Sequence, residues 1–266
     1  MRRYVVLEKK RGETPLMALN AWRSRNPQYA DVPATYAGRL DPMAEGKLLI
    51  LLGEECKKQE RYTNLDKEYV IDVLFDVGSD TGDALGLVGL AKRETRVDFT
   101  HLKNAFRAEK GVHERPYPAF SSKVVHGKPL FLHALEGTIG MIPIPLHTER
   151  IYEIERLSST LMSAKELKEY VHEFLSLVPR TNEPSKRLGE DFRIDAVRDH
   201  WEAVFRQAGN RRFVTVRLRV VCGSGTYMRA LAERLGKVFH TKALALSIRR
   251  TKIGKRMGTW WLKTYK

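Results

Sequence analysis

Cysteines are scarce in this sequence, and long apolar runs are missing. Only Cys56 and Cys222 are cysteines among 266 residues, and they lie far apart and outside any CxxC or Cys/His ligand spacing. This pattern indicates neither a disulfide framework nor a zinc site. The longest apolar run, residues 48–52, has the length of a strand and is too short to span a bilayer. Residues 1–10 carry no targeting signal. From these three observations together we expect a cytoplasmic protein that binds no metal and no membrane.

Acidic residues are missing from the last part of the chain. The 47 Lys and Arg against 32 Asp and Glu give a net charge of +15, and no acidic residue follows Glu233. The basic residues after that point are Arg234, Lys237, Lys242, Arg249, Arg250, Lys252, Lys255, Arg256, Lys263 and Lys266. So large an excess indicates a polyanionic partner, with nucleic acid ahead of an anionic membrane surface. A merely solvated basic surface is the alternative.

Apolar periodicity predicts a mixed α+β fold. Residues 67–77 and 212–220 alternate between apolar and polar side chains, which is typical of strands. Thr14 followed by Pro15 predicts an N-cap and the first position of a short helix, and residues 98–110 have a helical pattern. Lys123 to Lys128 predicts a hairpin turn. Strands and helices are interspersed with hairpins rather than strictly alternating, so a doubly wound sheet is disfavoured.

We expect one domain, residues 1–266, that contains a helical insertion at about residues 158–211. A Ser163/Glu166 capping box predicts a helix inside this segment, and its charges nearly balance. The insertion is interpreted either as a docking surface or extra RNA contact, or as a local helical hairpin packed on the sheet. None of the motifs described below lies within it, so we expect it to be peripheral to the chemistry.

Asp41 lies in the segment richest in functional signals. Taken alone, Asp41 is most simply an N-cap with Pro42 at the first helical position. The wider string combines Gly-Arg-Leu-Asp-Pro at residues 38–42, Gly46, and Gly-Glu-Glu-Cys-Lys at residues 53–57. This string closely resembles the catalytic signature of the TruB family of tRNA pseudouridine synthases.

Further segments resemble the same family in the same order along the chain. They are residues 66–69, 79–84, 118–123 with 127–130, 225–229, and 248–251 with Gly254. The resemblance implies a pseudouridine synthase catalytic fold of the α+β class, with a mixed, mostly antiparallel central sheet flanked by helices. Because the sequence stops at Lys266, soon after the last matching segment, we expect no PUA-type RNA-binding domain and a stand-alone bacterial type.

The resemblance implies that uridine in the T-loop of tRNA is converted to pseudouridine. This isomerisation needs a carboxylate at the ribose, acting as a nucleophile at C1′ or as a base at C2′, and no cofactor or metal. The family pattern places the carboxylate on Asp41 and assigns Arg229 as the cation that keeps it ionised. Tyr69 could be a core residue by its strand position, whereas the resemblance makes it the ring that packs on the extruded uracil.

The same resemblance gives candidate substrate-binding residues. Ile248 would form part of the apolar wall around the base, and Arg39 and Arg249 would contact RNA. Lys57 is interpreted as tuning the electrostatics around Asp41, although a surface lysine is an equal alternative. Tyr36 stands where the family usually has His, and a tyrosine can stack but lacks the second ring nitrogen. We expect a monomer that binds the T-arm of tRNA.

Three other functions compete with this one. The Gly-x-Gly-Thr turn at residues 223–226 before a helix could cradle a phosphate, but it lacks the rest of a nucleotide-binding motif. A non-catalytic RNA-binding protein would not need Asp41, Tyr69 and Arg229 together. The third alternative is the catalytic subunit of a guide-RNA particle, which the expected absence of a PUA-type domain disfavours.

Overall fold

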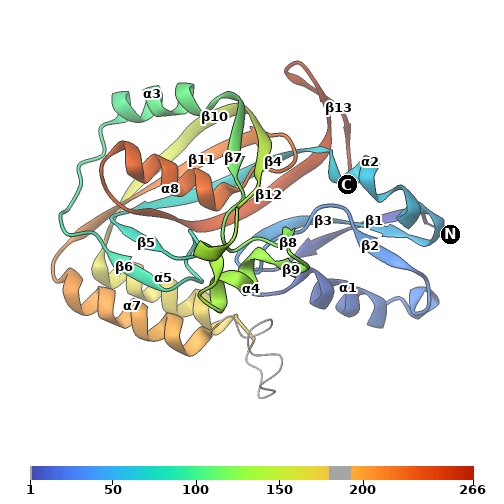
Figure 1. The fold of residues 1–266 in the computed structure, drawn as a ribbon, viewed down its shortest axis with the longest axis horizontal. Coiled ribbons are helices and arrows are strands. Elements are labelled where there is room, and N and C mark those ends of the chain that lie inside the picture. Colours follow the sequence, from blue (N-terminus) through green and yellow to red (C-terminus); the bar gives the residue numbers. More distant parts are fainter. Residues whose placement is uncertain (1, 180–192) are drawn as a thin grey trace.

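The computed structural model, which describes residues 2–179 and 193–266, is built on one large sheet and confirms the predicted α+β class (Figure 1). In the described residues this sheet has nine strands, in the order β1-β3-β12-β4-β11-β10-β7, with β13 beside β12 and β2 beside β3. Only β3 and β12 pair in parallel among these strands, so the sheet is mixed and mostly antiparallel, as predicted.

Strands outnumber helices in the described part of the chain. The strands are β1 (Tyr4–Lys9), β2 (Ala34–Tyr36), β3 (Glu45–Leu52), β4 (Asp66–Phe75), β5 (Val77–Ser79), β6 (Val88–Leu90), β7 (Gly111–Pro116), β8 (Val124–Val125), β9 (Lys128–Pro129), β10 (Leu146–Ser163), β11 (Arg212–Cys222), β12 (Ala243–Met257) and β13 (Trp260–Thr264). The α-helices are α1 (Pro15–Ser24), α2 (Gln59–Thr63), α3 (Phe99–Glu109), α4 (Leu130–Leu135), α5 (Ala164–Ser176), α7 (Ile194–Ala208) and α8 (Met228–Val238). Short 3-10 helices are η1 (Pro27–Tyr29), η2 (Gly53–Lys58) and η3 (Ile139–Met141).

Alternation along β4 distributes apolar side chains to both faces of the sheet. Ile71, Val73 and Phe75 belong to a core cluster with residues of α1, α3 and α8. Leu74 belongs to a second cluster with residues of α5 and α7. The sheet is therefore covered on both faces, and its central strands are buried.

Two helices, α1 and α5, begin at the N-cap residues that the sequence predicts. The Thr14 side chain accepts a hydrogen bond from the amide of Met17, with Pro15 at the start of α1. Ser163 and Glu166 form the predicted capping box of α5. Both caps satisfy amide groups that have no partner inside the helix.

The predicted insertion contains the end of β10 and the helices α5 and α7, which lie side by side (Figure 1). Residues 180–192 of that prediction lie outside the described residues. β10 and β11 remain paired as far as Ser163 and Arg212. Both helices therefore lie in the connection between these two strands, beyond the end of their paired region. The prediction that residues 158–211 are an insertion relative to the family stays a prediction.

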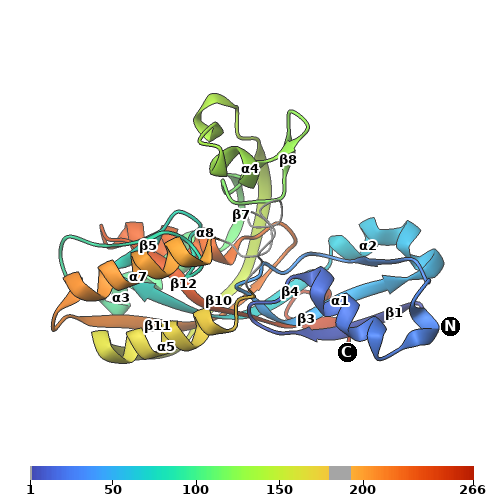
Figure 2. The same ribbon diagram turned by 90° about the horizontal axis from the view of Figure 1, so that it is seen from below.

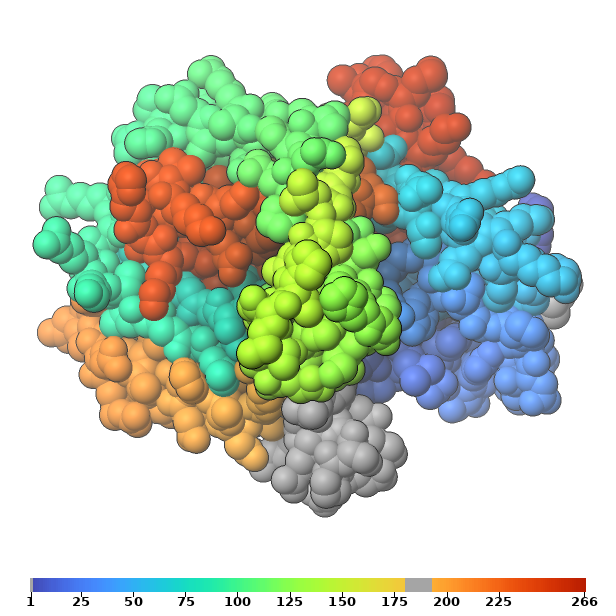
Figure 3. Space-filling view, in the orientation of Figure 1, coloured from blue at the N-terminus to red at the C-terminus, as the bar shows by residue number. Residues whose placement is uncertain are grey.

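Residues 117–145, which we call the projecting segment, stand away from the sheet between β7 and β10 (Figure 2). The β8–β9 turn in this segment confirms the predicted hairpin. In the space-filling view the segment lies in front, between the N-terminal residues and the half that contains α7 and α8 (Figure 3). It is placed to form one wall of a cavity over the sheet.

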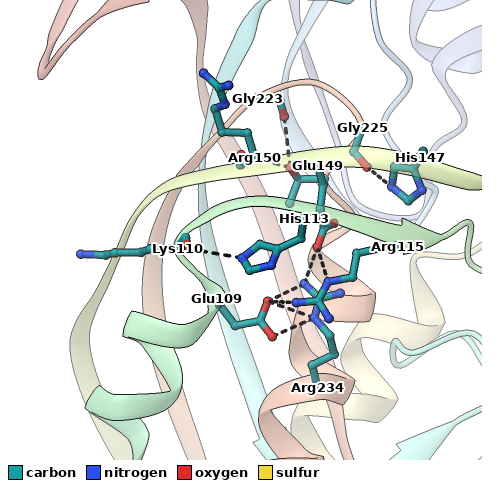
Figure 4. A network of polar contacts seen from close by, with 11 residues as sticks. Glu109, Lys110, His113, Arg115, His147, Glu149, Arg150, Gly223, Gly225 and Arg234 are labelled. Carbon is teal, nitrogen blue, oxygen red and sulfur yellow. Dashed lines mark hydrogen bonds and ion pairs between the residues drawn. The ribbon is translucent and has the colours of Figure 1, made fainter.

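An ion-pair network ties the root of the projecting segment to α8 (Figure 4). Arg234 of α8 binds Glu109 of α3 and Glu149 of β10, with Nη2–Oε distances of 2.9 and 2.8 Å. Arg115 of β7 lies 3.5 Å from each of the same two carboxylates. The Glu149 side chain is only 1% exposed, and these two arginines supply the opposite charges beside it.

Candidate active site

A cavity of about 610 Å³ lies over the centre of the sheet. It is enclosed by the loop before β3, the start of the projecting segment and the turn that leads into α8. Six of the eight predicted site residues line it, namely Tyr36, Arg39, Asp41, Tyr69, Arg229 and Ile248. Its volume is in the range of small-molecule pockets and can hold one nucleoside.

Asp41 lies in a tight turn between β2 and β3. Its carbonyl accepts a hydrogen bond from the amide of Ala44 at 2.9 Å, and no helix begins at Pro42, so the N-cap interpretation is wrong. Gly46, the second residue of β3, has φ +101°, and a Cβ there would overlap the carbonyl oxygen of Arg250. Glycine is thus required for β3 to pass close to β12. The Asp41 side chain is 43% exposed and faces the cavity.

Arg229, near the start of α8, binds Asp41 directly. Its Nε donates to Asp41 Oδ2 at 2.8 Å, while Nη1 and Nη2 donate to the carbonyls of Thr81 at 2.7 Å and Phe120 at 3.0 Å. Burial lowers the pKa of the guanidinium, but Asp41 and Asp83 outweigh burial and the pKa is raised. Arg229 is therefore a buried, permanently charged group held from three directions.

Asp83 is a second carboxylate in the site, and it is absent from the predicted set. Its Oδ2 lies 3.6 Å from Arg229 Nε, and its Oδ1 accepts from the Thr81 hydroxyl at 2.8 Å and the Leu85 amide at 2.9 Å. Burial raises the pKa of Asp83 to about 6, with Arg229 opposing the change and Asp41 adding to it. Residues 79–84 resemble a family loop, but nothing in the local sequence separates Asp83 from a turn-forming aspartate.

Arg250 is another buried residue that the sequence does not single out for the site. Its side chain donates to the carbonyls of Lys47 at 2.7 Å, Gly38 at 3.2 Å and Arg39 at 3.3 Å. These bonds hold both ends of the loop that carries Asp41. The sequence does contain a signal that could have found Arg250. It is two residues from Ile248, a predicted site residue, and alternation places both on the same face of β12.

Tyr69 and Ile248 form the apolar wall of the cavity. Tyr69 pairs with Arg250 across β4 and β12, and Ile248 pairs with Ile71, so the two side chains are close neighbours on one face. Tyr69 is 9% exposed and Ile248 is 3% exposed. Burial raises the pKa of the Tyr69 phenol, which keeps it neutral. The strand prediction for residues 67–77 is thereby confirmed for β4.

Lys57 and Arg249 are not brought to the cavity. Lys57 is 75% exposed on η2 and pairs with Glu54 at 2.6 Å. Arg249 is 55% exposed and pairs with Glu8 at 2.7 Å and Glu45 at 3.7 Å. The electrostatic role of Lys57 and the RNA contact of Arg249 stay predictions.

Tyr36 and Arg39 lie together on the cavity wall. The Arg39 guanidinium carbon is 5.8 Å from the centre of the Tyr36 ring.

In residues 2–179 and 193–266, no group of three or more His, Cys, Asp or Glu side chains could hold a metal ion, and no helix is long and apolar enough to cross a membrane.

Comparisons with known proteins match this chain to one family. Residues 30–172 match the family model for the N-terminal domain of TruB family pseudouridylate synthases. The tRNA pseudouridine synthase B of Thermus thermophilus is 30% identical over 221 residues, which cover 83% of this chain and 64% of that protein. The enzyme of the same name from Aromatoleum aromaticum is 29% identical over 250 residues, covering 94% of this chain and 62% of the relative. The chain thus spans less than two thirds of the length of these relatives.

A solved structure, that of a Cbf5-Nop10-Gar1 complex, shares the fold. Its TM-score is 0.53 at 18% sequence identity, and the match covers 94% of this chain and 48% of the other. The shared fold is that of a mixed, mostly antiparallel sheet flanked by helices, which confirms the predicted architecture.

Proposed function

We propose that this chain, which belongs to the TruB family of pseudouridylate synthases, converts uridine to pseudouridine in tRNA. The observation that carries the proposal is the Asp41 carboxylate, which faces the cavity while Arg229 holds its Oδ2 at 2.8 Å. Tyr69 and Ile248 supply an apolar wall beside it that suits a flat pyrimidine. The relatives named tRNA pseudouridine synthase B support tRNA as the substrate.

The reaction exchanges one glycosidic bond for another. The N1–C1′ bond breaks, the uracil rotates, a C5–C1′ bond forms, the proton on C5 is lost and N1 gains a proton. Atoms and electrons balance without any oxidant or cofactor. With Oδ2 bound to Arg229, Asp41 presents its other oxygen to the ribose, as a nucleophile at C1′ or a base at C2′.

The cavity requires a uridine that has left its base stack. Extruding a base costs a few kcal/mol, which contacts to phosphates and to neighbouring bases must offset. Tyr36 and Arg39 both line the cavity, and we propose that they make such contacts, one by stacking and one by charge. We propose the T-loop of tRNA as the source of this uridine, and hence a cytoplasmic site of action.

Tritium release from a T-arm minihelix labelled at C5 of uridine tests the reaction. We expect release in proportion to enzyme turnover, and a pseudouridine at one T-loop position when the product is mapped. Mapping of bulk tRNA from cells with and without the gene tests the substrate. If the purified protein binds the minihelix but releases no tritium, it is an RNA-binding protein and the proposed activity is wrong.

A further inference from the structure

We propose that Arg193, at the N-cap of α7, is a positioning residue that holds the two backbone partners of Arg229 in place. This inference rests on the proposed function and extends it to a part of the chain expected to be peripheral. Arg193 lies within the predicted insertion, and it lines the cavity. The expectation that the insertion is peripheral to the chemistry stays a prediction.

The first contact of Arg193 is with the loop that carries Thr81. Its Nη1 donates to Asp80 Oδ2 at 2.8 Å, and both side chains are largely covered, with exposures of 22% and 31%. The other oxygen of Asp80 accepts from the Leu87 amide at 2.7 Å. The Asp80 side chain thereby bridges the two ends of the loop formed by residues 80–87. Thr81 is the next residue, and its carbonyl accepts from Arg229 Nη1.

The second contact of Arg193 is with the projecting segment. Its guanidinium carbon lies 5.1 Å from the centre of the Phe120 ring, which is within the range of a cation–π interaction. The carbonyl of Phe120 accepts from Arg229 Nη2. Arg193 therefore touches one residue that binds Arg229 and the immediate neighbour of the other.

Helix α7 holds the same loop at a second point. Trp201, whose side chain is fully buried, donates its ring N–H to the carbonyl of Ala84 at 3.0 Å. Ala84 directly follows Asp83, the carboxylate beside Arg229. The helix is thus anchored at both sides of residues 81–83, and Arg193 links this anchored loop to the projecting segment.

A change at Arg193 should act on turnover through the direction of the Arg229 side chain. In Arg193→Gln the loop and the projecting segment lose their shared cation, and small displacements of Thr81 and Phe120 would misdirect Nε from Asp41. We expect kcat to fall on the order of 10- to 100-fold. The affinity for RNA, measured in an Asp41→Asn background, should change less than about threefold because phosphate contacts supply most of it.

The experiment measures kcat and KM by tritium release from the T-arm minihelix. Asp80→Asn keeps an oxygen for the Leu87 amide and removes only the charge that Arg193 binds, so it should reproduce the Arg193→Gln defect. The double variant should be no worse than either single variant. Arg193→Lys should recover most of the lost kcat, and Arg206→Gln, an exposed arginine later in α7, should match the wild type.

Three results would overturn the inference. They are an unchanged kcat and KM in Arg193→Gln, additive losses in the double variant, and an unchanged kcat with a raised KM, which would make Arg193 an RNA contact. A wild-type protein that releases no tritium would instead overturn the proposed function, and the positioning role would fall with it. Circular dichroism melts of each variant verify that the fold is intact.

Discussion

Strand β12 presents two different surfaces at neighbouring residues. Arg250 is 1% exposed, lines the cavity and donates to three backbone carbonyls of the loop region around Asp41. Arg249 is 55% exposed on the opposite face and binds Glu8 and Glu45. The two side chains have the same charge, yet one organises the site and the other forms exposed ion pairs, which contribute little to stability.

Charge density alone therefore does not identify the cations of this site. The basic C-terminal end is conspicuous in the sequence, but exposed members such as Arg249 pair with glutamates. Lys252, for example, lies 3.0 Å from Glu68. Arg229 and Arg250, by contrast, line the cavity and are buried among carbonyls and carboxylates. Burial makes their hydrogen bonds strong and their removal costly.

The largest effect should come from Asp41→Asn. Arg250 of β12 holds the loop that carries Asp41, so its importance for turnover depends on the chemistry that the Asp41 carboxylate does. An amide has nearly the same shape as the carboxylate but cannot attack the ribose or take its proton. We expect turnover to fall on the order of 10⁴-fold or more. RNA affinity should stay within about tenfold. Tritium release and filter binding on the same preparation measure both, and wild-type release by the variant would assign the chemistry to another residue.

Arg250→Met should have the next largest effect, because it removes the buried member of the Arg249–Arg250 pair. The substitution leaves the carbonyls of Gly38, Arg39 and Lys47 without the donors of the buried Arg250 side chain, at a cost of roughly 3 kcal/mol or more. The loop that carries Asp41 would also lose its anchor, so turnover should fall even where the protein is folded. Urea unfolding monitored by circular dichroism measures the loss. A midpoint equal to that of the wild type would show that water replaces the guanidinium at no cost.

Asp83→Asn should give opposite changes in stability and activity. The pKa of Asp83 is about 6 in the folded protein against the ordinary 3.8, so its protonation stabilises the fold. This stability is fully present below pH about 4 and is lost as the pH rises through about 6. The neutral amide should therefore raise the urea midpoint at neutral pH, with the gain shrinking below pH about 6.

Turnover of Asp83→Asn should fall on the order of 10-fold, because Arg229 loses one of the two carboxylates that orient it. Wild-type turnover should decline as the pH falls through about 6, whereas the variant should lack that step. A pH–rate profile from tritium release compares the two. The same step in both proteins would assign it to a group other than Asp83.

Much of the fold and part of the site follow from local sequence patterns. The alternation of β4 and the caps of α1 and α5 are set by residues close in sequence, and the structure reproduces them. The family motifs predict Asp41, Tyr69 and Arg229 as site residues, and all three line the cavity although they come from a loop, a strand and a helix. The alternative interpretation of Asp41 as a helix N-cap is wrong because a helix and a tight turn share the same Asp-Pro signal.

The remaining site residues depend on contacts between distant segments. Arg193 reaches Asp80 across more than a hundred residues of chain, and the Asp83–Arg229 pair is even more remote in sequence. A single sequence does not show which distant residues are close together in the folded protein. In the sequence, Arg193, Asp80 and Asp83 therefore look like ordinary charged surface residues. Lys57 is the reverse case: it belongs to the family-like string, yet its side chain is 75% exposed and does not line the cavity, so its electrostatic role stays a prediction.

Arg249→Gln should have the smallest effect and tests the exposed member of the pair. Its guanidinium is 55% exposed and pairs with the exposed Glu8 and the partly buried Glu45. We therefore expect a change in unfolding free energy within about 1 kcal/mol and a wild-type kcat. Its place off the cavity wall also predicts a salt dependence of RNA binding close to that of the wild type. If Arg249 does bind a phosphate, the slope of log K against log salt should fall by about 0.9, the value for one contact. Such a fall in a salt titration would confirm the predicted RNA contact of Arg249, and would show that the exposed face of β12 also serves the substrate.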